Sequence, residues 1–183
     1  MEEKSLIWHE EESKPVFNCR VFSVREIKSR SPLNKLQTYT VIDATDWAIT
    51  VPVLETEQGK KFVMVKQWRH GAGQLSLEFP GGVFNPMENA EQAAARELRE
   101  ETGYTPGKIQ KIGEFCPNPA IMSNHVHFFL AENLTGLGKQ ELDEDEYVET
   151  VIMDIDEVIK KMGQPPFIHA LMGTALSLYY RRL

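Results

Sequence analysis

The sequence predicts an α+β fold, an α/β/α sandwich around a mixed β-sheet, with a β-rich extension at the N-terminus. Apolar and polar residues alternate over much of the first 80 residues, which is typical of strands. A well-delimited helical segment follows at about 91–102, and two further helical segments close the chain. Strands mixed with a few helices, without regular βαβ alternation, favour such a sandwich.

The N-terminal extension is expected to cover residues 1–45, ahead of a main domain at 46–183. Residues 1–15 are polar, and we expect them to be weakly structured. From Val16 the stretch VFNCRVFSVREIKS alternates in the manner of a strand, and TYTVIDAT at 38–45 predicts another.

The main domain begins with strands predicted at 47–55 and 61–69, which a turn at 57–60 joins into a hairpin. A short strand over 75–79 runs into Pro80-Gly81-Gly82, where we expect the two glycines to form a turn. Further strands are predicted at 109–115, 125–131 and 150–155, with a loop rich in Pro and Asn at 116–124.

The helix at about 91–102 has clear sequence signals at both ends. Asn89, with Gln92 three residues later, forms a capping-box pattern, and Gly103 is a suitable residue for ending a helix. Helices predicted at 156–162 and 167–180 are separated by Pro165-Pro166, which breaks helical structure.

Composition excludes several classes of protein. A length of 183 residues, with 42% hydrophobic and 26% charged residues, suits a compact globular domain. The net charge of −7 argues against nucleic-acid binding, and no apolar run is long enough to suggest a membrane span. Cys19 and Cys116 form no disulfide framework and the N-terminus lacks signal-peptide features, so we expect a cytoplasmic protein.

The stretch at 82–104, GVFNPMENAEQAAARELREETGY, carries the most chemical information. Glu97, Glu100 and Glu101 are three and four residues apart, so a helix places them on one face. A hard cation with oxygen ligands would relieve their repulsion, and Mg²⁺ or Mn²⁺ fits better than zinc because no His or Cys shares this face. The alternative is a solvated acidic face partnered by Arg96 and Arg99.

This stretch resembles the signature of the Nudix hydrolase family. The matching pattern is Gly82, five residues, Glu88, seven residues, and then Arg96-Glu97-Leu98-x-Glu100-Glu101-x-Gly103-Tyr104. The order of the flanking strands is similar to the family's α/β/α sandwich, so the resemblance covers most of the chain. It implies Mg²⁺-dependent hydrolysis of a nucleoside diphosphate linked to another moiety.

The resemblance also assigns roles to residues of the motif. In the family, carboxylates that match Glu97, Glu100 and Glu101 hold the metal ions, together with the backbone carbonyl that matches Gly81; we count Glu100 as a catalytic candidate too. Glu88 and Arg96 match a pair that holds the loop on the helix, a structural role. The sequence contains no recognisable Ser/His/Asp or Cys/His constellation for covalent catalysis.

Residues upstream of the motif bear on the substrate. Lys66-Gln67-Trp68-Arg69 and Leu77-Glu78-Phe79-Pro80-Gly81-Gly82 are similar to the layout of ADP-ribose pyrophosphatases and their nucleoside-diphosphate-sugar relatives, and Pro119 lies near a proline diagnostic of that subgroup. Arg69 suits bidentate binding of a phosphate, the alternative being a surface ion pair. Glu78 is a candidate for binding a metal or a substrate hydroxyl, or for a structural role.

Aromatic residues and histidines supply further candidates. Trp47 is a candidate for stacking on the nucleobase, with a core or dimer-interface position as the alternative, and Trp8 is a second candidate. His125 and His127 alternate on a predicted strand, and we expect them to be partly buried or to line the substrate site, not to bind a metal.

The general base is expected in the acidic loop at 141–149. Glu146 matches the family's catalytic loop best and Glu144 is second, while the other acids there are interpreted as solvated charge. Closure of such a loop over the substrate would bring the base into the site.

These features predict Mg²⁺-dependent hydrolysis of ADP-ribose or a related nucleoside diphosphate sugar, giving a nucleoside monophosphate and a sugar phosphate. Gly81 stands where the subgroup often has Ala, which leaves room for GDP-mannose or another nucleotide sugar. The alternatives are a Nudix hydrolase of dinucleoside polyphosphates or modified nucleoside triphosphates, and a non-catalytic nucleotide sensor. Since strands ahead of the core commonly exchange between subunits in this subgroup, the resemblance also implies a homodimer.

Overall fold

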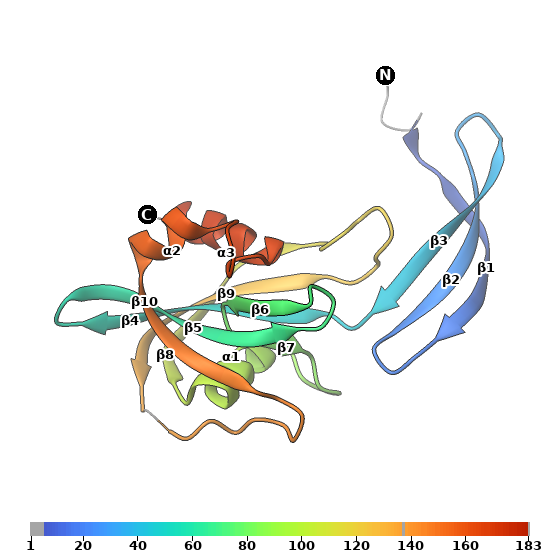
Figure 1. Cartoon of the computed structure of the whole chain (residues 1–183). Helices are drawn as coiled ribbons and strands as arrows, with labels where there is room; N and C mark the ends of the chain where they lie inside the picture. The colour runs from blue at the N-terminus through green and yellow to red at the C-terminus, as the bar shows by residue number, and fades with distance from the viewer. Residues whose placement is uncertain (1–5, 137, 183) are drawn as a thin grey trace. The chain divides into compact units, whose positions relative to one another are not determined.

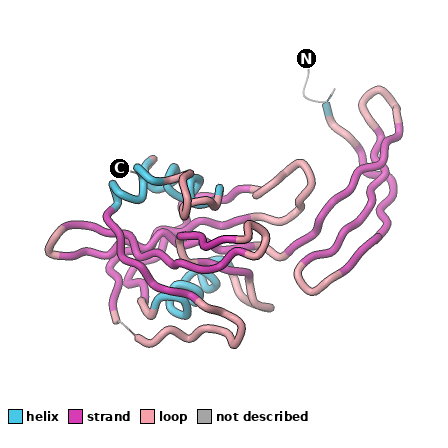
Figure 2. The backbone as a smooth tube through the Cα atoms, viewed as in Figure 1, coloured by secondary structure: helices cyan, strands magenta, loops and turns pink. Residues whose placement is uncertain are grey.

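The structure is a computed structural model that describes residues 6–136 and 138–182. It divides into two compact units. The first contains the chain up to Asp46 together with Cys116–His125, and the second contains Trp47–Phe115 and the chain from Val126 onward. Strands are the commonest regular structure in both units, as the backbone tube shows (Figure 2).

The first unit is a three-stranded antiparallel sheet in the order β1-β2-β3 (Figure 1). Its strands are β1 (His9–Asn18), β2 (Phe22–Arg30) and β3 (Leu36–Ala44). The expectation of weak structure through residue 15 was therefore wrong from His9 onward, and the predicted single strand from Val16 is a hairpin. The polar strand β1 is held by its backbone pairing with β2 and by ion pairs such as Lys28–Glu12 at 2.6 Å.

The first unit lacks a hydrophobic core within its described residues. All residues of β1 are exposed, and the buried hydrophobic side chains of the chain lie in the second unit. Large apolar side chains are instead exposed, among them Trp8, Phe17, Leu33 and Tyr39. Three strands are stable when a hydrophobic face is covered, so this sheet lacks the burial that normally stabilises one.

The second unit is built on a mixed sheet, as predicted. Its strand order is β10-β5-β4-β9-β8, with β6 pairing β5 and β7 pairing β4. The strands are β4 (Trp47–Thr56), β5 (Gly59–Arg69), β6 (Gln74–Glu78), β7 (Gly81–Val83), β8 (Thr105–Phe115), β9 (Val126–Thr135) and β10 (Val148–Asp154). The β4–β9 pairing is parallel and the other pairings are antiparallel.

Helices cover both faces of this sheet (Figure 1). Helix α1 (Ala90–Thr102) packs through Ala93 and Ala94 on Ala48 and Phe129. Helices α2 (Ile155–Lys161) and α3 (Ala170–Tyr180) contribute to the larger core cluster on the other face. No helix among the described residues is long and apolar enough to cross a membrane.

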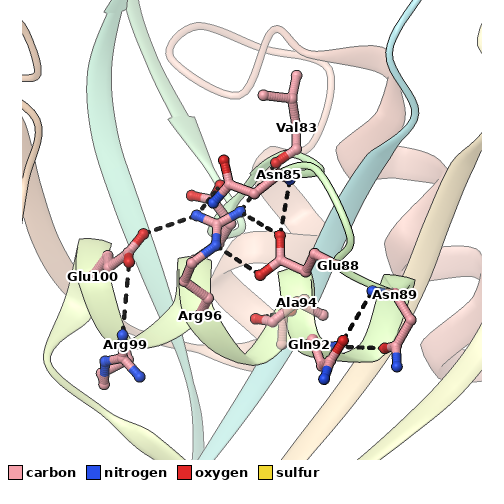
Figure 3. Close-up of polar contacts among 11 residues, drawn as sticks. Val83, Asn85, Glu88, Asn89, Gln92, Ala94, Arg96, Arg99 and Glu100 are labelled. Carbon is pink, nitrogen blue, oxygen red and sulfur yellow. Dashed lines mark hydrogen bonds and ion pairs between the residues drawn. The ribbon is translucent and has the colours of Figure 1, made fainter.

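The ends of α1 match the sequence prediction. The Asn89 side chain accepts a hydrogen bond from the Gln92 backbone N–H at 2.9 Å, and the Gln92 side chain accepts one from Asn89 N–H at 3.0 Å (Figure 3). Gly103 ends the helix with φ of 75°, a left-handed conformation that glycine adopts at little cost. These caps fix where the acidic face of the helix begins and ends.

Candidate active site

Gly81 and Gly82 contact the acidic helix because neither has a side chain. Gly81 and Gly82 were expected to form a turn, but they lie in the short strand β7, opposite Ile49 and Ala48 of β4. A Cβ atom on Gly81 would overlap the Ala48 carbonyl, and one on Gly82 would overlap the Glu97 carboxylate. The two glycines therefore let a carboxylate and a neighbouring strand approach the backbone directly.

Arg96 organises the acidic side chains around it (Figure 3). Its guanidinium donates to both oxygens of Glu88, at 2.9 and 3.0 Å, and to the Val83 carbonyl at 3.0 Å. Nη1 donates to Glu97 and to Glu100, both at 2.8 Å. The pairing of Glu88 with Arg96 is the one that the resemblance implied, and it ties the loop after β7 to α1.

Glu101 is the most buried carboxylate of the cluster, with 4% of its surface exposed. It accepts a hydrogen bond from the Gly81 backbone N–H at 2.9 Å. Burial, reinforced by the negative charge of Glu97, raises the pKa of Glu101 to about 8 despite that hydrogen bond. Burial also raises the pKa of Glu97, although Arg96 opposes the shift. The buried Glu101 and the partly buried Glu97 thus lie close together, and their charges repel each other.

The donor chemistry of this cluster fits a hard divalent cation. Its carboxylate oxygens are the ligands that Mg²⁺ prefers. After burial, the negative charges of neighbouring carboxylates also raise the pKa values of Glu97 and Glu101, and a bound cation would offset that repulsion. Across residues 6–136 and 138–182, however, no three acidic, His or Cys side chains are arranged to hold an ion as they lie. Arg96 Nη1 instead bridges Glu97 and Glu100.

The acidic loop after β9 is attached to the end of α1. The backbone N–H groups of Gly138 and Glu141 donate to the carbonyls of Gly103 and Glu100, both at 2.9 Å. The Gln140 side chain donates to the carbonyl of Glu101. The loop that carries the candidate bases is therefore anchored on the same helix as the carboxylate cluster.

The loop brings Glu146 within electrostatic reach of the cluster. Burial and closer charged groups have the larger effects on the pKa values of Glu97 and Glu101. The negative charge of Glu146 makes a smaller contribution, which also raises both values. Glu146 closes a turn with Asp143, whose backbone N–H donates to the Glu146 carboxylate at 3.3 Å. Glu144 is exposed in the same turn.

Arg69 and Glu78 are joined to each other across the β5–β6 hairpin. Arg69 donates to the two oxygens of Glu78 at 2.9 and 2.7 Å, and His169 Nδ1 lies 3.0 Å from the second oxygen. Burial alone would raise the pKa of Glu78, but the hydrogen bonds from Arg69 and His169 hold it well below its usual range. The pKa of Arg69 is raised chiefly by its hydrogen bonds to Glu78. The nearby negative charges of Glu101 and Glu146 raise it further.

His169 was missed by sequence reasoning. It lies 91 residues from Glu78 along the chain, immediately before α3. The sequence around it contains no motif that pairs it with an acid so distant. Only the packing of the α3 N-terminus beside β6 brings the two side chains together.

The remaining sequence candidates fall in several places. Trp47 packs against the core cluster of the second unit, which matches the core alternative. Trp8 contacts Tyr39 edge-on in the first unit, and both line a hollow of about 490 Å³ together with Pro119. His125 and His127 are both partly buried, as expected. His127 packs on Phe84 and lies 3.2 Å from Glu114.

Comparison with known proteins agrees with this geometry. A model of the NUDIX domain family matches residues 45–171. An ADP-ribose pyrophosphatase of Bacillus subtilis is 42% identical over 134 residues, 73% of this chain and 71% of that protein. A methanol dehydrogenase activator of Bacillus methanolicus is 32% identical over 114 residues, 60% of each chain.

The fold has a close counterpart among solved structures. A crystal structure of an ADP compounds hydrolase superposes with a TM-score of 0.86 at 22% identity, covering 99% of this chain and 97% of the other. This likeness confirms the predicted fold class, an α/β/α sandwich with a β-rich extension.

Proposed function

The chain belongs to the Nudix family, and we propose that it hydrolyses the diphosphate bond of ADP-ribose or a related nucleoside diphosphate sugar. The products are a nucleoside monophosphate and a sugar phosphate. The observation that carries this proposal is the meeting of the α1 carboxylates with Glu146 and Arg69 in one region. A relative named ADP-ribose pyrophosphatase, 42% identical, supports the choice of substrate class.

The proposed cofactor is Mg²⁺, with Mn²⁺ as an alternative. Glu97, Glu100, Glu101 and the Gly81 carbonyl would hold it, and the uncompensated charge on Glu97 and Glu101 supports this assignment. A bound divalent cation supplies charge neutralisation for the diphosphate and lowers the pKa of a bound water. Arg96 would keep Glu88 as its partner and so retain its hold on the loop.

In this proposal the chain's own residues position the substrate and move a proton. Arg69 binds a phosphate oxygen. Trp47 is less suited to stacking on the base, because it is partly buried and packs against the core cluster. Glu146 accepts the proton of the attacking water, with Glu144 as the second candidate, while Glu100 serves as both ligand and catalytic residue. Glu78 is less suited to binding a substrate hydroxyl, because it is 1% exposed and its oxygens already accept bonds.

The substrate is tested by a panel with Mg²⁺ that contains ADP-ribose, GDP-mannose, UDP-glucose and diadenosine polyphosphates. We expect the highest kcat/KM for ADP-ribose or another nucleotide sugar. A preference for dinucleoside polyphosphates or modified nucleoside triphosphates would favour the alternative Nudix activity. Binding of nucleotides without turnover of any compound would instead favour a sensor.

The base is tested by comparing Glu146→Gln with Glu144→Gln. We expect Glu146→Gln to lower kcat by roughly 10²–10⁴-fold, the usual contribution of a general base. Glu144→Gln is the matched control, since it is exposed in the same turn, and its kcat should stay within about two-fold of wild type. The reverse ranking would transfer the role to Glu144.

We propose that the protein is a homodimer through the first unit. This unit buries no hydrophobic side chain among its described residues, while Trp8, Phe17, Leu33 and Tyr39 are exposed. Its charges are largely paired within the sheet, as in Arg25–Asp43 at 2.9 Å. A neutral apolar surface suits a permanent interface between identical subunits.

Sedimentation equilibrium tests the dimer. The wild-type protein should sediment at twice the chain mass, and Tyr39→Glu should shift it towards the monomer because it buries a charge in the apolar surface. Lys14→Glu, a charge change on β1, serves as the control. A wild-type protein that stays monomeric at all concentrations would refute the proposal.

We also propose a cytoplasmic location without nucleic-acid or membrane partners. Cys19 and Cys116 are both free thiols, which suits a reducing compartment. The net charge of −7 disfavours association with a polyanion such as nucleic acid.

A further inference from the structure

The carboxylate of Glu78 is fully engaged inside the second unit. Its first oxygen accepts from Arg69 Nε at 2.9 Å, and its second accepts from Arg69 Nη2 at 2.7 Å. His169 Nδ1 lies 3.0 Å from that second oxygen. A carboxylate paired with a guanidinium is ionised and can only accept, so His169 must carry its hydrogen on Nδ1 and donate it.

The backbone fixes His169 beside Glu78. The residues on either side of Glu78 both donate backbone N–H groups to the segment that contains His169. Leu77 donates to the carbonyl of Pro166 at 3.0 Å, and Phe79 donates to the sulfur of Met172 at 2.9 Å. His169 lies between these two contact points along the chain, so its position follows from how the α3 N-terminus is attached to β6.

Arg69 is the solvent-facing end of this arrangement. Its side chain is 42% exposed, whereas that of Glu78 is 1% exposed. Nε and Nη2 are used by Glu78, while Nη1 makes no hydrogen bond within residues 6–136 and 138–182. The charges of Glu101 and Glu146 act on this guanidinium, so Arg69 lies in the neighbourhood of the carboxylate cluster. A guanidinium that is held by a carboxylate on one side and has free N–H donors on the other side suits the binding of a phosphate group.

We infer that His169 is a positioning residue that orients Arg69 for the substrate phosphate by holding the Glu78 carboxylate. His169 does not itself contact the substrate. Without its hydrogen bond, Glu78 and the guanidinium bound to it can turn together, and the phosphate loses an oriented partner. The inference rests on the proposed function for the identity of the ligand.

Steady-state kinetics on ADP-ribose with Mg²⁺ test the inference, using His169→Ala and His169→Asn in the full chain. We expect His169→Ala to raise KM roughly ten-fold with kcat within about two-fold, the scale of one charge-assisted hydrogen bond. His169→Asn should restore KM to within about three-fold, because an amide can donate to Glu78. Gln164→Ala, an exposed truncation in the same loop, should leave both constants unchanged.

A purely structural role for His169 predicts another pattern. His169→Ala would then lower the melting temperature and the active fraction, so kcat would fall without a selective rise in KM, and Asn would give no rescue in KM. That pattern, or a KM that His169→Ala does not change, would overturn the inference.

A second measurement separates failure of this inference from failure of the proposed function. In ¹⁵N-labelled protein without substrate, the Arg69 Nε–H signal, assigned by its loss in Arg69→Lys, should exchange slowly with water. His169→Ala should accelerate that exchange at least several-fold, and His169→Asn should slow it again. If ADP-ribose is not hydrolysed, the proposed function fails while this experiment still decides the positioning role. Unchanged exchange in His169→Ala would overturn it.

Discussion

Glu101→Gln is expected to abolish most hydrolysis and, at the same time, to stabilise the metal-free protein. The folded-state pKa of Glu101 is raised from 4.5 to about 8. Below pH 4.5 the carboxyl is neutral in both states, but between these values the unfolded chain gives up its proton more readily. The free energy of unfolding should therefore fall as pH rises from about 4.5 to about 8, and then level off.

Glutamine removes this pH dependence, because it stays neutral and can still accept the Gly81 hydrogen bond. At pH 8.5 the gain should be of the order of a few kcal/mol, since each pKa unit corresponds to ~1.4 kcal/mol. Urea unfolding at pH 5 and pH 8.5 in EDTA measures it, and the gain at pH 5 should be small. The same variant should lose roughly a thousand-fold in kcat/KM with Mg²⁺, about 4 kcal/mol of transition-state stabilisation.

Two outcomes would show that Glu101 does not have these roles. Full activity in Glu101→Gln would remove it from the metal site. Equal stability of wild type and Glu101→Gln at pH 8.5 would show that the buried carboxylate carries no electrostatic penalty.

Arg96→Ala should have the opposite effect on stability. The change leaves Glu88, Glu97 and Glu100 without their common partner, and their side chains are only 13–26% exposed. Removing one partner of buried ion pairs leaves charge unpaired, so we expect a loss of about 2–4 kcal/mol at pH 7. The hydrogen bond from Arg96 lowers the pKa of Glu88, so this contribution should diminish as pH falls below about 4.5.

Arg99→Ala is the matched control on the same helix. Arg99 is 49% exposed and its ion pairs with Glu100 and Glu141 are long, at 3.6 and 3.8 Å. Such surface pairs contribute little, and the loss should be below about 1 kcal/mol. If chemical denaturation finds similar losses for the two variants, Arg96 is not the organising residue of the cluster.

The sequence predicted best those features of the fold that depend on residues close together in the chain. The ends of α1 follow from Asn89, Gln92 and Gly103, which act within one turn of the helix. Strand β1 was missed because its residues are polar on both faces, and only its pairing with β2 makes it a strand. Strand β7 was missed for a similar reason, since Gly81-Gly82 becomes a strand only through its pairing with β4.

In the candidate site, too, contacts between residues close in the sequence were predicted, and contacts between distant segments were not. The shared face of Glu97, Glu100 and Glu101 follows from helical spacing, and the pairing of Glu88 with Arg96 follows from the family signature. The bond between Arg69 and Glu78 depends on the register of the β5–β6 hairpin, which the sequence does not specify. The third partner, His169, depends on how α3 packs, and no residue pattern near it indicates that contact.

Metal-dependent hydrolysis of the diphosphate is tested most directly by following ADP-ribose by ³¹P NMR with wild-type protein treated with EDTA and then resupplied with Mg²⁺. We predict that the diphosphate signals persist in EDTA and are replaced by those of AMP and ribose 5-phosphate once Mg²⁺ is added. Glu101→Gln, run in parallel, should leave the diphosphate intact. Hydrolysis that continues in EDTA would show that the reaction needs no metal ion, and an intact diphosphate after addition of Mg²⁺ to wild type would rule out ADP-ribose hydrolysis.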